Sequence, residues 1–192
     1  MRSAAADATR TRILAAAREL LAGGPGQPAF SLDGVARVAG VTRLTVYNQF
    51  ESKRGLLEAL FDDIARAGGL FELPQVIGQP DAEAALRDFV AVFCRFWAAH
   101  RRTMPRFHAV VRLDDELAAS LAERSERRRH ALASLVRRLA PRRDESGADL
   151  VDALFALTSF EFHAMLCVRG RGAKAVEALV QRLVAAAVDA YR

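Results

Sequence analysis

Three small or aliphatic residues at fixed spacing constrain the fold of this chain most: Ala36, Gly40 and Val46. They belong to two short segments, residues 31–40 and 42–50, whose apolar residues follow helical spacing. Two helices that meet at a tight turn need a small residue where they approach and a glycine where the backbone reverses with positive φ. They also need an aliphatic residue from the second helix that locks the pair. The sequence therefore predicts a helix-turn-helix.

The rest of the chain also shows helical spacing and no convincing alternation of strands, so the predicted fold class is all-α with about nine helices. Thr9 or Asp7 is expected to cap the first helix. Further helices are predicted from about residue 52 to 67, 81 to 99, 115 to 139, 147 to 168 and 173 to 190, with a short piece around Phe107. Residues 68–80, which contain glycine and proline, form the predicted linker between a domain of residues 1–66 and one of residues 67–192.

The second helix of the predicted pair carries side chains that suit a nucleic acid. Thr42 is a good N-cap for this helix. The residues left outside its packing stripe are Arg43, Leu44, Thr45, Tyr47, Asn48 and Gln49. Arginine and amide side chains can read base edges in the major groove, whereas Thr and Tyr more often reach phosphate oxygens. The alternative is a short amphipathic helix with an ordinary polar face.

Lys53 and Arg54 stand where the next helix begins, and cations in that position oppose the helix dipole. A DNA phosphate at this helix terminus would remove the conflict, because the free N–H groups and Lys53 would both bind it. The alternative is that both side chains are solvated at a small cost. Residues 1–54 hold eight cations and four acids, a net charge of +4, which favours a polyanion as the partner of this part.

Residues 9–66 resemble the TetR family of bacterial transcriptional regulators. The resemblance is carried by TRILAAARELLAGG and by FSLDGVARVAGVTRLTVYNQFESKRGLLEALF, in which the segment from Gly40 to Lys53 is the most specific. It implies an all-helical homodimer. Residues 1–66 would be the helix-turn-helix DNA-binding domain, and residues 67–192 the effector-binding and dimerisation domain.

The resemblance also assigns roles to single residues. Ser31 and Thr42 would cap helices and touch phosphate, and Tyr47 and Lys53 would contact the DNA backbone. The positions nearest the bases would be Arg43, Leu44, Thr45 and Asn48. Two residues depart from the family pattern: Gln49 stands where His is frequent, and Leu44 stands where Gly or Ala is frequent. The first can alter a phosphate contact, and the second suggests an apolar contact with a thymine methyl or a different approach to the groove.

The last predicted helix has a wide apolar stripe that one domain of this size could hardly cover alone. The stripe consists of Val176, Leu179, Val180, Leu183, Val184, Ala187 and Val188. By the resemblance, the last two helices would pair with those of a second copy in a dimer interface. Two recognition helices about 34–36 Å apart would then match one turn of a two-fold symmetric operator.

An effector pocket is expected between the long helices of the second domain. Its candidate lining consists of Phe89, Phe93, Phe96, Trp97, Met104, Phe107, His108, Phe155, Glu161, Phe162 and Met165. A single aromatic at helical spacing is more often core, but the set as a whole predicts an apolar ligand. Glu161 shares a predicted helical stripe with Leu150, Leu154 and Leu157, so it either contacts the ligand or is held by a structural or interface partner.

Two other groups of polar residues have weaker signals. His163 and Cys167 share a helix face at i, i+4 spacing, which can ligate metal, but no third ligand is evident. No metal site and no cofactor is therefore expected. The run ERSERRRH, residues 123–130, is interpreted as a solvated helix face.

The composition, 52% apolar and 27% charged, is that of a soluble globular protein. We expect a cytoplasmic protein with no membrane partner, because no uncharged run is long enough to span a bilayer and MRSAAADATRTR lacks the apolar core of a secretory signal. No nucleophile–base pair or phosphate loop appears, so an enzyme is not expected. The favoured function is a repressor that a small apolar effector releases from its operator. The alternatives are an effector-independent DNA-binding protein and a transcriptional activator of the same fold.

Overall fold

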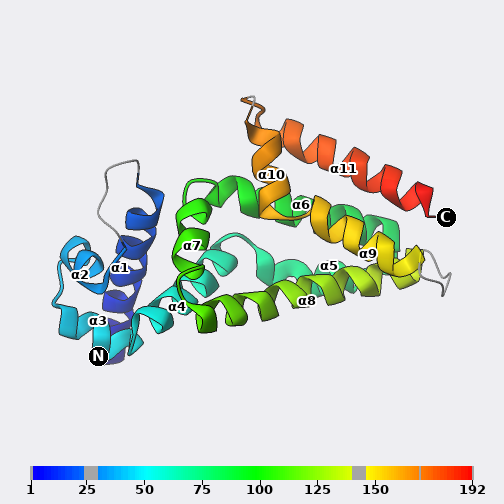
Figure 1. The fold of residues 1–192 in the computed structure, drawn as a ribbon. Coiled ribbons are helices and arrows are strands. Elements are labelled where there is room, and N and C mark those ends of the chain that lie inside the picture. The colour runs from blue at the N-terminus through cyan, green and yellow to red at the C-terminus, as the bar shows by residue number, and fades with distance from the viewer. Residues whose placement is uncertain (1, 24–29, 140–145, 169, 192) are drawn as a thin grey trace. The chain divides into compact units, whose positions relative to one another are not determined.

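The computed structural model describes residues 2–23, 30–139, 146–168 and 170–191. Within these ranges the chain forms eleven α-helices, one 3-10 helix and no strand, which confirms the all-α prediction. The elements are α1 (Arg2–Ala22), α2 (Leu32–Ala39), α3 (Arg43–Phe50), α4 (Lys53–Ala67), η1 (Leu70–Glu72), α5 (Leu73–Ile77), α6 (Ala82–His100), α7 (Met104–Val111), α8 (Asp115–Leu139), α9 (Ser146–Leu157), α10 (Phe160–Cys167) and α11 (Ala173–Ala190) (Figure 1).

Contacts within the chain divide it into two units. The first unit holds residues 1–66 and 100–118, and the second holds residues 67–99 and 119–192. The first unit therefore contains α1 to α4, α7 and the first turn of α8, and the second contains η1, α5, α6, the rest of α8 and α9 to α11. Residues 100–118 lie within the range that the sequence assigned to the second domain, but their contacts group them with the N-terminal helices.

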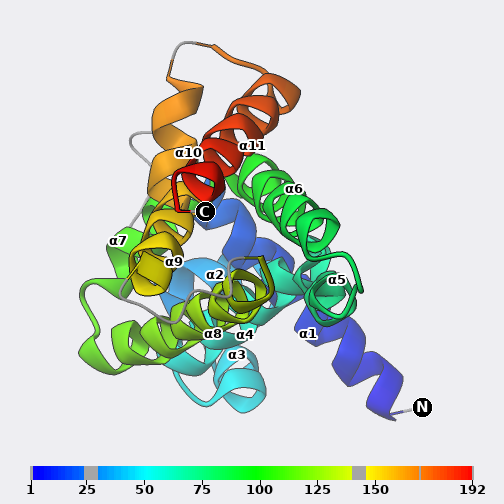
Figure 2. The ribbon, with the colours of Figure 1, turned by 90° about the vertical axis from the view of Figure 1, so that its right-hand side faces the viewer.

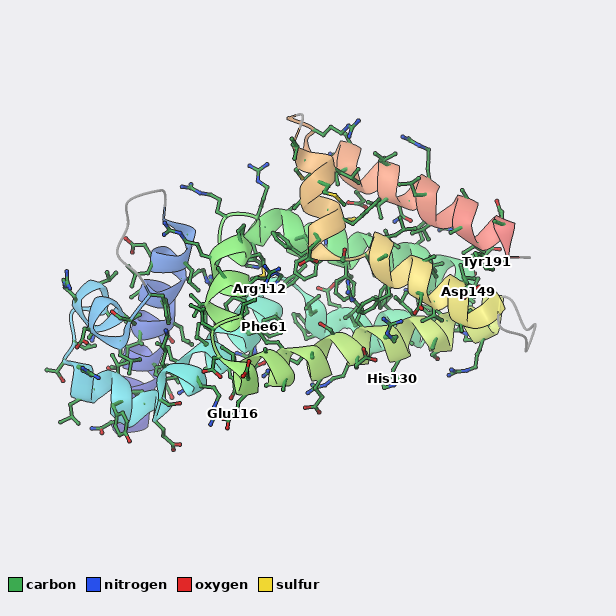
Figure 3. The ribbon with its side chains drawn as sticks, viewed as in Figure 1. Phe61, Arg112, Glu116, His130, Asp149 and Tyr191 are labelled. Carbon is green, nitrogen blue, oxygen red and sulfur yellow. The ribbon has the colours of Figure 1, made fainter. Side chains whose placement is uncertain are left out.

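Contacts of α7 explain this grouping. The ring of Phe107 stacks on that of Phe61 in α4, with centroids 5.8 Å apart, and Phe61 is labelled in Figure 3. The Arg106 Nη1 donates a hydrogen bond to the carbonyl oxygen of Leu20 in α1 at 3.2 Å. Phe107 is fully buried. Burial of an aromatic side chain is among the largest single contributions to a core, so α7 is an integral part of the first unit.

α2 and α3 form the predicted helix-turn-helix. Gly40 follows α2 in the left-handed region with φ 64°, where glycine has no steric penalty. Its N–H bonds to the Arg37 carbonyl at 3.3 Å, and the N–H of Val41 bonds to that of Ala36 at 3.0 Å. The side chains of Ala36 and Val46 are buried, and α2 contacts both α1 and α3. The three residues of the sequence pattern thus have the expected places.

The start of α1 differs from the sequence prediction, in which Thr9 or Asp7 caps the first helix. α1 begins at Arg2, so both residues lie inside it. The hydroxyl groups of Thr9 and Thr11 each donate to a carbonyl oxygen one turn back, those of Ala5 and Asp7, at 2.9 Å. Because threonine can be satisfied inside a helix in this way, its preference for caps does not fix the helix boundary.

The predicted linker, residues 68–80, contains regular structure. Gly69 adopts φ 81° and lets the chain turn after α4, and Pro74 occupies the first turn of α5, where a missing N–H has no cost. The Arg138 guanidinium of α8 donates to the carbonyl oxygen of Ile77 at 2.7 Å and also bonds that of Gln79. These bonds satisfy carbonyl groups at the end of α5, so this segment is fixed to α8 within the second unit.

The prediction of one helix over residues 147–168 is wrong, because α9 and α10 meet at a break with a bend of 50°. The Thr158 hydroxyl donates to the carbonyl oxygen of Leu154 at 2.8 Å, and the Ser159 hydroxyl caps α10 by accepting from the N–H of Phe162 at 3.1 Å. Ser and Thr side chains offer the backbone an alternative to the helical pattern, and two in succession end α9 here.

In the second unit the buried side chains come mainly from four helices. α6 contributes its apolar face and α11 a row of valines, while α8 contributes Leu132, Leu135 and Val136 and α9 contributes Leu150 and Leu154. α11 contacts both α9 and α10, and Figure 2 shows it beside them.

Among the described residues, no single helix has the length and apolar character of a bilayer span. Only the bent pair α9 and α10, taken together, has them.

Candidate nucleic-acid interface

Hydroxyl side chains begin both helices of the helix-turn-helix. Ser31 Oγ accepts from the N–H of Gly34 at 3.1 Å, and Thr42 Oγ1 accepts from that of Thr45 at 3.1 Å. The predicted caps are therefore confirmed. The Ser31 hydroxyl that accepts in this way keeps its own proton for donation, whereas Thr42 Oγ1 also lies 2.8 Å from Thr45 Oγ1, and either hydroxyl can donate to the other. The N–H groups of the first turn of each helix carry partial positive charge. Both helix starts are thus suited to an anion such as a phosphate.

The recognition helix candidate, α3, has one buried and one exposed face. Val46 and Phe50 are 0% and 5% exposed, whereas Leu44 and Tyr47 are 66% and 56% exposed. The other predicted contact residues divide into exposed Thr42, Arg43 and Asn48 and half-buried Thr45 and Gln49. Leu44 and Tyr47 are three positions apart and therefore neighbours on the exposed face of α3, where they form a small apolar patch that fits a surface covered by another molecule.

Arg43 has a partner that sequence spacing did not indicate. Its Nη1 lies 3.2 Å from Oδ2 of Asp33 in α2, and both side chains are mostly exposed. A surface ion pair of this kind contributes about 0–1 kcal/mol. Asp33 therefore holds the guanidinium at the edge of α3 only weakly, and a base or a phosphate can replace the carboxylate at little cost.

The two cations at the start of α4 have different environments. Arg54 forms an ion pair with Glu116 in the first turn of α8, and Glu116 is labelled in Figure 3. Lys53 is exposed, with its Nζ 6.0 Å from the centre of the Phe30 ring. Ser52 caps the helix by accepting from the N–H of Gly55 at 2.9 Å. The conflict with the helix dipole is thus offset by a carboxylate for Arg54, whereas Lys53 keeps its charge at the surface.

The turn between α3 and α4 has an uncommon backbone. Glu51 ends α3 with φ 63°, a region that side chains with a Cβ rarely adopt. A Cβ at Gly55 would lie 2.2 Å from the carbonyl oxygen of Phe50, so only glycine permits this close approach. The turn between α3 and α4 therefore combines a positive φ at residue 51 with a close approach that requires glycine at residue 55.

The predicted effector-pocket residues do not form one group. Met104, Phe107 and His108 lie in the first unit. In the second unit the rings of Phe89, Phe93, Phe96 and Trp97 contact one another in sequence along α6, with centroid distances from 4.5 to 6.1 Å. Phe162 is half-buried, and Met165 is 63% exposed.

Arg128 of α8 belongs to this aromatic cluster, which the interpretation of residues 123–130 as a solvated face missed. Its Cζ lies 4.0 Å and 5.5 Å from the ring centres of Phe155 and Phe93, and its Nη1 donates to the Thr158 carbonyl oxygen at 2.6 Å. Burial lowers the pKa of Arg128 to about 10, although the negative charge of Glu161 acts in the opposite direction. A guanidinium stacked on aromatic faces is detectable only once the helices are packed.

The prediction for Glu161 has to be corrected in one respect. The helix break places it in α10, so it does not share a helix with Leu150, Leu154 and Leu157. It is exposed in this chain and lies close enough to Arg128 to favour the charged guanidinium. An exposed acid needs no special compensation, so the burial argument for a ligand contact at Glu161 no longer holds.

A groove of about 580 Å³ lies in the second unit between α6, α11 and the end of α8. Its lining consists of Glu83, Leu86, Arg87, Asp88, Ala91, Leu139, Glu177, Gln181, Arg182, Val184, Ala185, Val188 and Asp189. As far as the chain is described, this lining shares no residue with the predicted pocket. Its volume is that of a small-molecule site, but its walls mix apolar and charged side chains.

The predicted dimer stripe of α11 is partly covered by the chain itself. Val176, Val180 and Val184 are 0%, 0% and 3% exposed. Leu183 keeps 36% of its surface exposed, and Leu179 and Ala187 are half-buried. The expectation that one domain could hardly cover this stripe is therefore wrong for the valines. A contact with a second copy stays a prediction for the remaining side of the helix.

His163 and Cys167 lie one turn apart in α10, with Sγ 3.8 Å from Nδ1. No group of three or more His, Cys, Asp or Glu residues that could hold a metal ion occurs among the residues described. Cys94 of α6 is buried, and burial raises the pKa of its thiol to about 12, with smaller contributions from Glu177 and Cys167. Thiols in such an environment are poor nucleophiles.

This chain is similar to known proteins both in the sequence of its N-terminal helices and in its fold. Residues 13–60 match the profile of a family described as "Bacterial regulatory proteins, tetR family". The fold is similar to that of a candidate TetR-family transcriptional regulator from Mesorhizobium loti, with a TM-score of 0.62 and 18% identity over 97% of this chain and 96% of that chain. It is also similar to the TetR-like transcriptional regulator LfrR from Mycobacterium smegmatis, with a TM-score of 0.51 and 21% identity over 96% and 98% of the two chains.

No match was found among curated proteins. The matched residues 13–60 include the helix-turn-helix and the start of α4, the same elements that carry the exposed α3 face and Lys53. The resemblance of the N-terminal helices to the TetR family is thus confirmed over residues 13–60, and the fold of the whole chain is TetR-like.

Proposed function

We propose that this protein is a DNA-binding transcriptional regulator that acts in the cytoplasm as a homodimer on a palindromic operator. The observation that carries the proposal is the exposed face of α3, with Leu44 and Tyr47 at 66% and 56% exposure beside exposed Arg43 and Asn48. Arg43 and Asn48 would read base edges, Leu44 would meet a thymine methyl, and Tyr47 would bind a phosphate oxygen.

Three further residues would position the phosphate backbone. The hydroxyl groups of Ser31 and Thr42 stand at the starts of α2 and α3, and Lys53 stands at the start of α4. Helix N-termini and a nearby cation together favour phosphate. Gln49 and Thr45, both half-buried, would contribute at the margin of this surface. These contacts would fix the orientation of α3, while its exposed face would supply sequence preference.

A homodimer is supported by the partly exposed side of α11 with Leu179, Leu183 and Ala187, and by the exposed Met165 of α10. A symmetric pair of α3 helices could occupy successive major grooves. We infer that the second unit binds a small, mainly apolar effector and that the effector releases the repressor. Such release requires different effector affinities in the DNA-bound and the released conformations. The aromatic cluster of α6 and the groove beside α11 are the candidate sites.

A gel-shift titration with the intergenic DNA upstream of the protein's own gene tests the proposal. Tyr47→Ala should lose nearly all affinity while fold and dimer are retained, and Tyr47→Phe should lose the part that the hydroxyl contributes. Leu113→Ala is the control, because Leu113 is 86% exposed in the same unit but lies outside the helix-turn-helix. Unchanged binding by Tyr47→Ala would refute the role of α3.

Thermal-shift measurements separate a ligand-responsive regulator from an effector-independent one of the same fold. An effector at concentration L that binds only the folded protein stabilises it by RT ln(1 + L/Kd), so the unfolding midpoint rises with the logarithm of effector concentration once that concentration exceeds Kd. If no compound of a broad apolar and amphipathic panel stabilises the dimer, while DNA binding is intact, the effector-independent alternative is favoured.

Whether bound protein lowers or raises transcription of the adjacent gene distinguishes a repressor from an activator.

A further inference from the structure

We propose that Arg10 of α1 is a positioning residue for DNA recognition, because it holds the C-terminal turn of α3 in place; the inference rests on the DNA-binding function proposed above. The Arg10 Nη1 donates a hydrogen bond to the Gln49 carbonyl oxygen at 2.8 Å. Its Cζ lies 4.3 Å from the centre of the Phe50 ring. One side chain of α1 therefore contacts the last two residues of the helix that carries the proposed recognition face.

The end of α3 depends on contacts from outside the helix. The last four carbonyl groups of a helix have no partner within it. Here the N–H groups of Glu51 and Ser52 bond to the carbonyl oxygens of Tyr47 and Phe50, each at 2.6 Å, and Arg10 bonds to that of Gln49. Glu51 has the positive φ of a helix-ending residue without being a glycine, so this turn is held against a backbone preference.

The charge and the plane of Arg10 suit this position. A cation at a helix C-terminus interacts favourably with the helix dipole, and α3 has no basic residue of its own in its last turn. The guanidinium also stacks on the buried Phe50 ring, which fixes its orientation. A helix of eight residues is not stable by itself, so its orientation comes from such tertiary contacts.

The consequence for DNA binding follows from the location of the exposed residues. Tyr47 and Asn48 lie in the last turn of α3, next to the carbonyl group that Arg10 holds. A base-edge contact is lost when the side chain is displaced, whereas the attraction between a charge and the phosphate backbone changes little. Loss of Arg10 should therefore reduce the preference for the operator more than the affinity for DNA in general.

The test compares Arg10→Met, Arg10→Lys and Arg12→Met. Methionine keeps an apolar stem over Phe50 and removes the charge and the donors, whereas lysine keeps the charge and an ammonium group that can donate to the Gln49 carbonyl oxygen. Arg12 is exposed on the same helix two residues away, so Arg12→Met makes the same change in net charge without the contact to α3. Amide hydrogen exchange is measured on each free protein. Affinities for an operator fragment and for a random duplex are measured over a series of salt concentrations.

In Arg10→Met we expect exchange of the Glu51 and Ser52 amides to accelerate. The amides of buried Ile13 and Leu56 should exchange as before, once any change in the free energy of global unfolding is subtracted. The ratio of operator to random-duplex affinity should fall by about tenfold, the effect of one lost charge-assisted hydrogen bond. The salt slopes of Arg10→Met and Arg12→Met should be equal. Arg10→Lys should restore part of both the protection and the ratio, and Arg12→Met should preserve both.

Three outcomes would overturn the proposal. A salt slope for Arg10→Met that is smaller than that of Arg12→Met by about one, with equal losses on both duplexes, would make Arg10 a direct phosphate contact. Uniformly faster exchange with an unchanged affinity ratio would make it a general structural residue. Unchanged amide exchange at Glu51 and Ser52 in Arg10→Met would mean that Arg10 does not hold the C-terminal turn of α3. The exchange experiment needs no DNA, so failure of the wild-type protein to bind any duplex refutes the proposed function separately.

Discussion

The guanidinium of Arg54 pairs with the carboxylate of Glu116, which joins the first turn of α4 to the first turn of α8. Glu116→Gln should reduce the free energy of unfolding by less than about 1 kcal/mol, because both side chains are partly exposed and such pairs are weak. It should also strengthen binding to random-sequence DNA, since Arg54 loses its carboxylate partner and becomes available to phosphate. Fluorescence anisotropy at several salt concentrations measures this gain.

The control is Glu123→Gln, which makes the same change in net charge at an exposed position of the same helix. Equal gains in the two variants would mean that net charge alone, and not the release of Arg54, causes the effect.

Lys53→Ala should weaken binding to operator and to random DNA to the same extent, because a phosphate contact carries no sequence information. The slope of log affinity against log salt concentration should fall in magnitude by about one. Lys174, the other lysine of the chain, is exposed at the start of α11 and provides the matched control. Gel shifts over a range of salt concentrations check both variants. A loss confined to the operator would instead assign Lys53 to base recognition.

Gly55→Ala tests the close approach in the turn before α4. Replacing glycine by alanine inside a helix usually stabilises a protein by about 0.4–1 kcal/mol. Here the new Cβ would lie 2.2 Å from the Phe50 carbonyl oxygen, so we expect a loss of roughly 1–3 kcal/mol in urea unfolding. Gly172→Ala is the control, because a Cβ there would meet no heavy atom within 4 Å. A stabilising Gly55→Ala would show that the turn can relax without cost.

The pH dependence of stability should contain a contribution from His100. Burial and the positive charge of Arg18 lower its pKa below 6.5, with Asp63 acting in the opposite direction. Above pH 6.5 the imidazole is neutral in both states, and as the pH falls through 6.5 the unfolded chain takes up the proton first. The free energy of unfolding should therefore decrease as the pH is lowered below 6.5.

Urea unfolding at a series of pH values, with His100→Gln and His130→Gln, tests this assignment. His100→Gln should flatten the slope, and His130→Gln is the control for the same substitution at an exposed position of α8. Equal slopes in the wild type and His100→Gln would assign the dependence to other groups.

The sequence predicted best those features that depend on neighbours close along the chain. The spacing of Ala36, Gly40 and Val46, together with cap residues three positions before the N–H groups they bind, determined the helix-turn-helix. The partition of α3 into buried and exposed faces followed from the same spacing. The contact between Arg10 and Gln49 could not be predicted, because it joins residues 39 positions apart on different helices.

Two other features were not predicted. One has the same cause, and the other comes from a local interaction that competes with helical spacing. Arg128 looked solvated within a charged run, and only the packing of α8 against α9 places it on Phe155. The break between α9 and α10 was missed because apolar spacing continues across it, while the side chains of Thr158 and Ser159 redirect the backbone. Which aromatic residues line a ligand site depends on how the helices pack, and spacing along one helix carries no such information.

The break between α9 and α10 also gives one peptide group an additional role. In an unbroken helix the Thr158 carbonyl oxygen would accept from the N–H of Phe162, but that N–H bonds to the Ser159 hydroxyl instead. The freed oxygen accepts from Trp97 Nε1 of α6 at 2.9 Å and from Arg128 of α8 at 2.6 Å. A single oxygen atom thus links α6 and α8 to the junction of α9 and α10. Straightening the bend would require both of these hydrogen bonds to break.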